Sequence, residues 1–181
     1  VETLRAQGAM VAALDINPAI TKIFKQPEVL GIVCDVTQPD EITKAVSATV
    51  RRFGGLDILV SNAGIFPPSA TIAQMDQSSW QESLDINLNS HRVLMKTCIP
   101  YLELGIDPAI VIIASKNVPA PGPGAGAYSV AKAGLTQLAR VAALELAPKG
   151  IRVNVVHPNH VFDTAIWTPE VLANRAKNYK M

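Results

Sequence analysis

Tyr128 and Lys132 are four residues apart, as Y-x-x-x-K, at the start of a stretch with helical character. Side chains at positions i and i+4 share one face of a helix, so we expect the ammonium to lie close to the phenol. A nearby ammonium favours phenolate, so a Tyr with a reference pKa of about 10 can exchange a proton nearer neutral pH. Such a pair can act as the general acid/base of alcohol–carbonyl interconversion. Taken alone, however, the pair fits an ordinary exposed helix better.

Three further groups strengthen the catalytic interpretation. Ser115 lies 13 positions before Tyr128 and directly follows an apolar run, where its hydroxyl can stabilise charge on a substrate oxygen. In Asn62-Ala63-Gly64, the Asn can tie neighbouring strands and the Gly lets a cofactor approach the backbone. Asn87 is a poor helix former inside a helical pattern, which predicts a local kink or a held water. Each of these has a structural alternative, such as a Ser that simply ends a strand.

Alternating strands and helices are expected to position these groups. Short apolar runs predict five strands, at residues 9–14, 30–33, 56–60, 109–114 and 151–156. Helical periodicity predicts helices at residues 40–53, 79–104 and 128–147, with Pro100 bending or ending the second. This alternation indicates βαβ units and a parallel sheet in a single α/β domain over residues 1–181.

Ligands of such sheets bind beyond the carboxyl ends of the strands. Five residues follow the ends of the predicted strands within two positions: Asp15, Asp35, Asn62, Ser115 and Pro158. We therefore expect them to share one edge of the sheet and to form the site.

The composition excludes several other classes of protein. Apolar residues make up 49% of the 181 residues, and 16 basic residues face 15 acidic ones, which argues against disorder and gives no support to nucleic-acid binding. No run approaches about 18 apolar residues, so no membrane span is expected. Cys34 and Cys98 are expected to be buried thiols in a reducing compartment, the cytoplasm. The three histidines predict no metal site, and His91 is expected on a helix surface or an interface.

The order and separation of Asn62-Ala63-Gly64, Asn87, Ser115 and Tyr128/Lys132 resemble the short-chain dehydrogenase/reductase family over essentially the whole chain. The resemblance implies a Rossmann-type, doubly wound parallel sheet and a nicotinamide cofactor. It implies that Tyr128 is the acid/base, that Lys132 lowers its pKa and binds the nicotinamide ribose, and that Ser115 orients the substrate oxygen. Asn87 would hold the water of a proton relay.

The cofactor is expected to be NAD in preference to NADP. A carboxylate at Asp15 can bind both hydroxyls of the adenosine ribose and would repel a 2′-phosphate. Asp15 as the cap of a turn before Asn17-Pro18 fits equally well without the family context, and Lys22 could meet a phosphate. The resemblance places the remaining cofactor contacts at Asp35, Val36, Asn62, Ala63, Gly64, Tyr128, Lys132, Pro158, Val161 and Thr164.

Two departures from the family pattern concern the ends of the chain. We expect the first strand, with its T-G-x-x-x-G-x-G turn, and the last strand to be lacking, so that residues 1–181 form a partial domain. Residues 115–132 and 157–168 resemble the dehydrogenase part of bifunctional rhamnulose-phosphate aldolase/short-chain dehydrogenase proteins. That resemblance implies lactaldehyde or a similar short alcohol or aldehyde as substrate. We separately expect a homo-oligomer, either a dimer or a tetramer. The alternative is a catalytically incompetent Rossmann module that acts in oligomerisation or partner binding.

Overall fold

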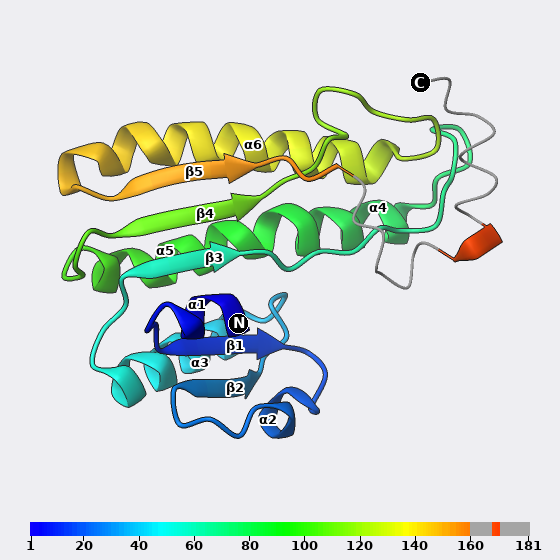
Figure 1. The fold of residues 1–181 in the computed structure, drawn as a ribbon. Coiled ribbons are helices and arrows are strands. Elements are labelled where there is room, and N and C mark those ends of the chain that lie inside the picture. The colour runs from blue at the N-terminus through cyan, green and yellow to red at the C-terminus, as the bar shows by residue number, and fades with distance from the viewer. Residues whose placement is uncertain (160–167, 171–181) are drawn as a thin grey trace.

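The computed structural model describes residues 1–159 and 168–170. Within them, the five predicted strands are β1 (Val11–Asp15), β2 (Val29–Val33), β3 (Ile58–Ser61), β4 (Ala109–Ile113) and β5 (Arg152–Val156). The helices are α1 (Glu2–Ala6), α2 (Ile20–Ile23), α3 (Pro39–Phe53), α4 (Gln77–Leu84), the π-helix η1 (Asp85–Asn89), α5 (Ser90–Leu102), α6 (Gly126–Leu146) and the 3-10 turn η2 (Ala147–Lys149). The predicted parallel α/β fold is confirmed, and Figure 1 shows its elements.

The strands form two parallel sheets. β1 pairs with β2, with Val11 opposite Val29, and β4 pairs with both β3 and β5. Figure 1 shows these two groups of strands one above the other. In the doubly wound strand order 3-2-1-4-5-6, the observed β2, β1, β3, β4 and β5 take places 3, 2, 4, 5 and 6. The interruption between β1 and β3 therefore falls where that fold has its first strand, the one expected to be lacking.

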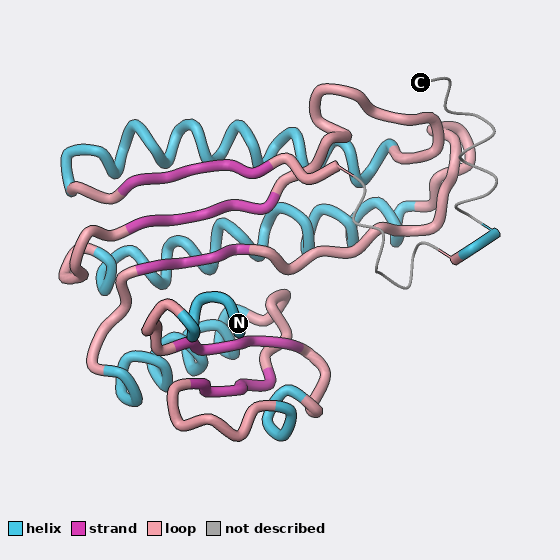
Figure 2. The backbone as a smooth tube through the Cα atoms, in the orientation of Figure 1, coloured by secondary structure: helices cyan, strands magenta, loops and turns pink. Residues whose placement is uncertain are grey.

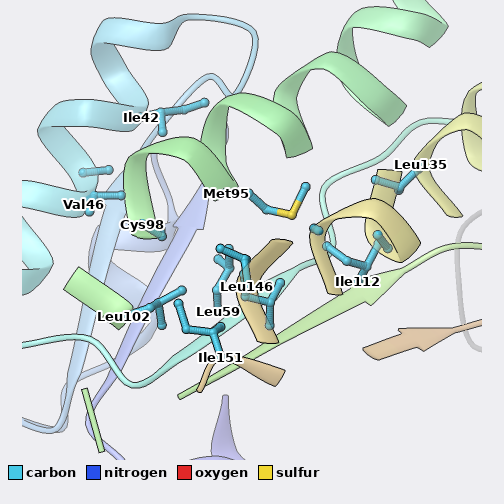
Figure 3. Packing of buried hydrophobic residues seen from close by; sticks show 14 of the residues in the cluster. Ile42, Val46, Leu59, Met95, Cys98, Leu102, Ile112, Leu135, Leu146 and Ile151 are labelled. Atoms are coloured by element: carbon cyan, nitrogen blue, oxygen red, sulfur yellow. The ribbon is translucent and has the colours of Figure 1, made fainter. Parts of the chain in front are cut away.

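Helix α3 packs into the hydrophobic core that the two sheets share. Pro39 suits its first turn because the missing N–H needs no partner there, and Gly54, with φ of 87°, ends it in the left-handed conformation. Its buried face carries Ile42 and Val46, which belong to one apolar cluster with Cys98 and Leu102 of α5 (Figure 3). The same cluster includes side chains from β3, β4 and α6, so the two sheets share one hydrophobic core.

The long helix predicted at residues 79–104 is three segments: α4, η1 and α5. It begins earlier than predicted because Asp76 caps it, its Oδ1 accepting a hydrogen bond from Ser79 N at 2.8 Å. Asn87 lies inside the π-helical segment, which confirms the predicted irregularity. Pro100 lies within α5, which ends at Leu102. Single π turns inside α-helices are frequent at functional sites.

Two further sequence predictions concern the interior of the fold. Cys34 and Cys98 are free thiols and are buried, as expected. Burial raises the pKa of Cys98 to about 12, so that this thiol stays protonated. In the part of the chain that the structure describes, no helix combines the length and the apolar character needed to cross a bilayer.

Candidate active site

Lys132 is the most deeply buried charged group of the site. It lies in the second turn of α6, is only 3% exposed, and donates a hydrogen bond from Nζ to the Ile113 carbonyl at 2.9 Å. Burial lowers its pKa to about 8, because desolvation disfavours the ammonium. The bond to Ile113 fixes the amine at the end of β4, two residues before Ser115.

Tyr128 shares the face of α6 on which Lys132 lies, as the four-residue spacing predicted. The Lys132 amine lies 5.9 Å from the centre of the Tyr128 ring. Phe66, from the loop after β3, packs against the ring of Tyr128, with ring centroids 4.8 Å apart and planes tilted by 52°. The half-buried phenol of Tyr128 is therefore bounded by Phe66.

Ser115 is 8% exposed at the end of β4 and is held by both of its neighbouring segments. Its Oγ accepts a hydrogen bond from Asn117 N at 3.1 Å, and its carbonyl accepts one from His157 Nδ1 at 2.9 Å. The side-chain Nδ2 of Asn117 donates a second hydrogen bond, to Oγ of Ser129 at 3.4 Å, next to Tyr128. Asn117 and His157 were not predicted from sequence to have a role, although His157 directly follows β5.

Asn87 is fully buried, and both ends of its carboxamide are engaged. Oδ1 accepts a hydrogen bond from Ile65 N at 3.0 Å, while Nδ2 donates to Ser83 Oγ at 3.2 Å. A Cβ at Gly64 would lie 2.9 Å from Asn87 Oδ1 and 3.4 Å from Lys132 Nζ. The structure therefore brings together the turn at residues 62–64, Asn87 and Lys132, three of the groups singled out from sequence.

The prediction that His91 lies on a helix surface or an interface is wrong. His91 is 1% exposed, with Nδ1 at 2.6 Å from Ser61 Oγ and Nε2 at 3.0 Å from the Ala63 carbonyl. The periodicity that predicted a helix at residues 79–104 depends on apolar residues, whereas Ser83, Asn87 and His91 are buried polar residues of the same stretch. Their four-residue spacing, continued by buried Met95, was the missed signal.

The remaining candidates lie where the strands of the two sheets end. Asp15 is exposed, and its Oδ1 accepts a hydrogen bond from Asn17 N at 2.8 Å, as the turn-cap alternative predicted. Asp35 Oδ1 accepts from Thr37 N at 2.9 Å and from its hydroxyl at 2.7 Å. Val36 is half-buried against the core, and Asn62 is exposed.

The end of the site after β5 is only partly described. The Pro158 carbonyl accepts a hydrogen bond from Lys116 N at 3.1 Å, which ties it to the residue after Ser115. The predicted contacts Val161 and Thr164 lie outside the described residues. Figure 2 shows the loops that follow β3, β4 and β5 gathering on one side of the molecule, so the candidates from the second sheet share an edge.

Comparison with known proteins assigns this arrangement to a family. The family model described as enoyl-(acyl carrier protein) reductase matches residues 1–177. Dehydrogenase/reductase SDR family member 4 of Homo sapiens is 34% identical over 142 residues, 77% of this chain and 51% of that protein. The chain belongs to the short-chain dehydrogenase/reductase family. It spans about half the length of the curated relatives it matches.

Solved short-chain dehydrogenase/reductase structures share the fold. A 3-ketoacyl-(acyl-carrier-protein) reductase from Brucella melitensis, complexed with NADH, is 25% identical with a TM-score of 0.81, over 85% of this chain and 67% of that one. Sorbitol-6-phosphate 2-dehydrogenase from Erwinia amylovora is 25% identical with a TM-score of 0.86, over 99% and 73% of the two chains. The Rossmann-type fold predicted from the motifs is thereby confirmed.

Proposed function

We propose that the chain carries the reaction centre of an NAD-dependent oxidoreductase that interconverts an alcohol and a carbonyl, with Tyr128 as the acid/base. One observation carries the proposal. Lys132, buried and bonded to the Ile113 carbonyl, holds its ammonium 5.9 Å from the Tyr128 ring. An ammonium fixed beside a phenol favours the phenolate, which is the state that can take a proton from an alcohol.

Each of the four central residues has a task that its surroundings support. With a pKa of about 8, Lys132 is mostly charged at neutral pH and can stabilise the phenolate of Tyr128. Ser115, with its Oγ held by the Asn117 amide, can donate its own proton to the substrate oxygen. Asn87 has one lone pair and one N–H beyond its two hydrogen bonds, which suffice to bind a water near Lys132.

The residues present fit the ribose and nicotinamide parts of a dinucleotide. Because Gly64 has no Cβ, the backbone of its turn can lie close to Asn87 and Lys132. The carboxylate of Asp15 suits the adenosine ribose of NAD better than the 2′-phosphate of NADP. When bound, a nicotinamide would supply or accept the hydride. No T-G-x-x-x-G-x-G turn occurs in residues 1–181, so these residues do not provide the family's pyrophosphate cradle. Val161 and Thr164 are proposed carboxamide and pyrophosphate contacts.

The substrate that we propose is a short hydroxyaldehyde such as lactaldehyde, or a related small alcohol or aldehyde. The supporting feature is the segment at residues 115–132, whose amino-acid sequence resembles the dehydrogenase part of bifunctional rhamnulose-phosphate aldolase/short-chain dehydrogenase proteins. We propose, as part of the same assignment, a homo-oligomer that works in the cytoplasm, where two buried thiols would stay reduced.

The deciding experiment follows NADH absorbance with a panel of short aldehydes and polyols. We expect Tyr128→Phe to lower kcat by about 1000-fold, the range of acid/base catalysis, with NADH affinity unchanged. Tyr101→Phe, which removes a hydroxyl from α5, is the matched control and is expected to leave turnover intact.

Two outcomes would reject the proposal. Equal turnover by wild type and Tyr128→Phe would remove the acid/base role. A wild-type protein that assembles but neither binds NADH nor turns over any aldehyde would favour the non-catalytic Rossmann module.

A further inference from the structure

The buried imidazole of His91 bridges two consecutive parts of the chain at the end of β3. Nδ1 lies 2.6 Å from Ser61 Oγ, in the last residue of the strand, and Nε2 lies 3.0 Å from the carbonyl of Ala63, in the turn that follows. Both ring nitrogens therefore form hydrogen bonds, and their partners, Ser61 and Ala63, are two residues apart in sequence. Ser61 and His91 are each 1% exposed, so no substrate reaches this pair and it is not a nucleophilic site.

The partners of His91 fix its tautomer. A carbonyl only accepts hydrogen bonds, so Nε2 must carry the proton that is shared with Ala63. In the neutral ring Nδ1 is then an acceptor, and the Ser61 hydroxyl donates to it. Burial, together with the nearby charge of Lys132, lowers the pKa of His91 to about 4, so the ring is neutral near pH 7.

His91 acts on the same turn as Asn87, four residues earlier. Asn87 Oδ1 accepts a hydrogen bond from the Ile65 N–H, while His91 donates one to the Ala63 carbonyl. Two side chains of one helical face therefore bind the residues directly before and directly after Gly64. Gly64 lies against Asn87 Oδ1 and Lys132 Nζ with no room for a Cβ. Loss of the Ala63 bond would let this turn rotate away from both groups.

We propose that His91 is a positioning residue that holds the Asn62–Ala63–Gly64 turn against Asn87 and Lys132. It thereby sets the backbone face that the nicotinamide cofactor approaches. The consequence for the cofactor rests on the proposed function, whereas the effect on the turn does not.

Amide hydrogen exchange at Ile65 tests the positioning role without cofactor. His91→Leu removes both hydrogen bonds at similar volume, and we expect exchange at Ile65 to accelerate by about tenfold or more. His91→Gln keeps an N–H donor within reach of the Ala63 carbonyl and is expected to restore most of the protection. Ile42→Val, a core change in α3, should destabilise the protein without a selective effect at Ile65. Ile65 exchange that is equal in wild type and His91→Leu would overturn the proposal.

The wild-type protein offers a second readout, which does not depend on the folding of a variant. Nitrogen-15 NMR of the imidazole is expected to show a neutral ring with the proton on Nε2 at about pH 7. A proton on Nδ1, or a charged ring, would contradict the inferred hydrogen bonds and overturn the proposal.

The cofactor readout separates this inference from the proposed function. We expect His91→Leu to raise the NADH dissociation constant by about tenfold, and His91→Gln by about twofold or less. Wild-type protein that does not bind NADH would reject the proposed function, while Ile65 exchange would still decide the role of His91. Tight NADH binding by a folded His91→Leu protein with a loosened turn would overturn the link between the turn and the cofactor.

Discussion

The two sheets hold their candidate residues by different means. At the ends of β1 and β2, Asp15 binds the backbone of Asn17 and Asp35 binds Thr37, each two residues away. Around β3, β4 and β5 the hydrogen bonds join segments that are distant in sequence. The two partners of each bond are 19 to 42 residues apart. The pairs are Lys132 and Ile113, Asn87 and Ile65, His91 and Ala63, and His157 and Ser115.

The contrast separates two kinds of site. The β1–β2 half presents carboxylates on self-contained turns, which need only local chain geometry. The β3–β5 half assembles its groups by packing, so its chemistry depends on the integrity of the whole core. Substitutions that act on one half and spare the other test this division.

The largest expected effect is on the fold of the β1–β2 half. A Cβ at Gly31 of β2 would overlap the backbone carbonyl oxygen of Ile20 and lie 3.2 Å from the Thr21 Cα. No flexible side chain can yield there, so we expect Gly31→Ala to lower the free energy of unfolding by more than about 3 kcal/mol. Urea denaturation followed by circular dichroism measures the change.

Gly55→Ala is the matched control for this substitution, because no atom lies within 4 Å of its added Cβ. It is expected to change the stability by less than about 0.5 kcal/mol. A Gly31→Ala protein as stable as this control would mean that β2 and α2 do not depend on their close approach.

The second effect ties the stability of the β3–β5 half to pH. Because the pKa of Lys132 falls from 10.5 to about 8 on folding, the unfolded chain binds more protons between these two values. The free energy of unfolding therefore rises with pH across this window, by up to about 3 kcal/mol, and the gain is lost as pH falls through 8. Urea denaturation at about pH 7.5 and pH 10 measures the rise.

Lys132→Met is expected to abolish this pH-dependent rise, because its side chain carries no titratable proton. Lys96→Met, at an exposed position of α5, is expected to keep it. An identical pH dependence in wild type and Lys132→Met would show that the amine keeps an ordinary pKa.

The third effect concerns catalysis and not stability. A Cβ at Gly64 would be tight only against the side-chain atoms Asn87 Oδ1 and Lys132 Nζ, because the Asn62 carbonyl oxygen is at an ordinary contact distance of 3.8 Å. The fold can therefore accommodate the Cβ by moving these side chains. We expect Gly64→Ala to lower kcat/KM by about 100-fold, because displaced groups lose their alignment. Its stability should stay within about 1 kcal/mol of wild type. A Gly64→Ala enzyme as active as Gly55→Ala would remove the turn from the site.

The same division explains what could be predicted from the sequence. Asp15, the last residue of β1, and Asp35, two residues after β2, were correctly placed at strand ends because the strand pattern and the turn residues are local signals. Tyr128 and Lys132 were paired correctly because helical spacing alone brings them together. The lack of the family's first strand was expected from the absent Gly-rich turn, whereas the separation of the strands into two sheets was not predicted.

The role of His91 could not be predicted in that way. Its burial depends on bonds to Ser61 and Ala63, about 30 residues away, and hydrophobic periodicity gives no weight to a buried polar side chain whose partners satisfy it. His157 was missed for the same reason, since its partner is the carbonyl of Ser115, 42 residues away in the segment that follows β4.

The smallest effect tests whether Asp15, in the β1–β2 half, sets the preference between NADH and NADPH or only stabilises a turn. Asp15→Asn keeps an oxygen for the Asn17 N–H and loses the charge, whereas Asp15→Ala loses both. If the carboxylate repels a 2′-phosphate, both variants should raise the ratio of kcat/KM for NADPH to that for NADH by about tenfold. Asp40→Ala, which removes a charge from the first turn of α3, controls for net charge.

A different result would assign Asp15 to the turn alone. In that case neither variant shifts the ratio of kcat/KM for NADPH to that for NADH. Only Asp15→Ala then lowers the free energy of unfolding, by less than the contribution of one hydrogen bond, which is about 1 kcal/mol. An equal shift in Asp40→Ala would instead trace the preference to overall charge. Because the Asn17 bond engages Oδ1 and the side chain is exposed, the carboxylate can do both tasks at once, and the Asn variant separates them.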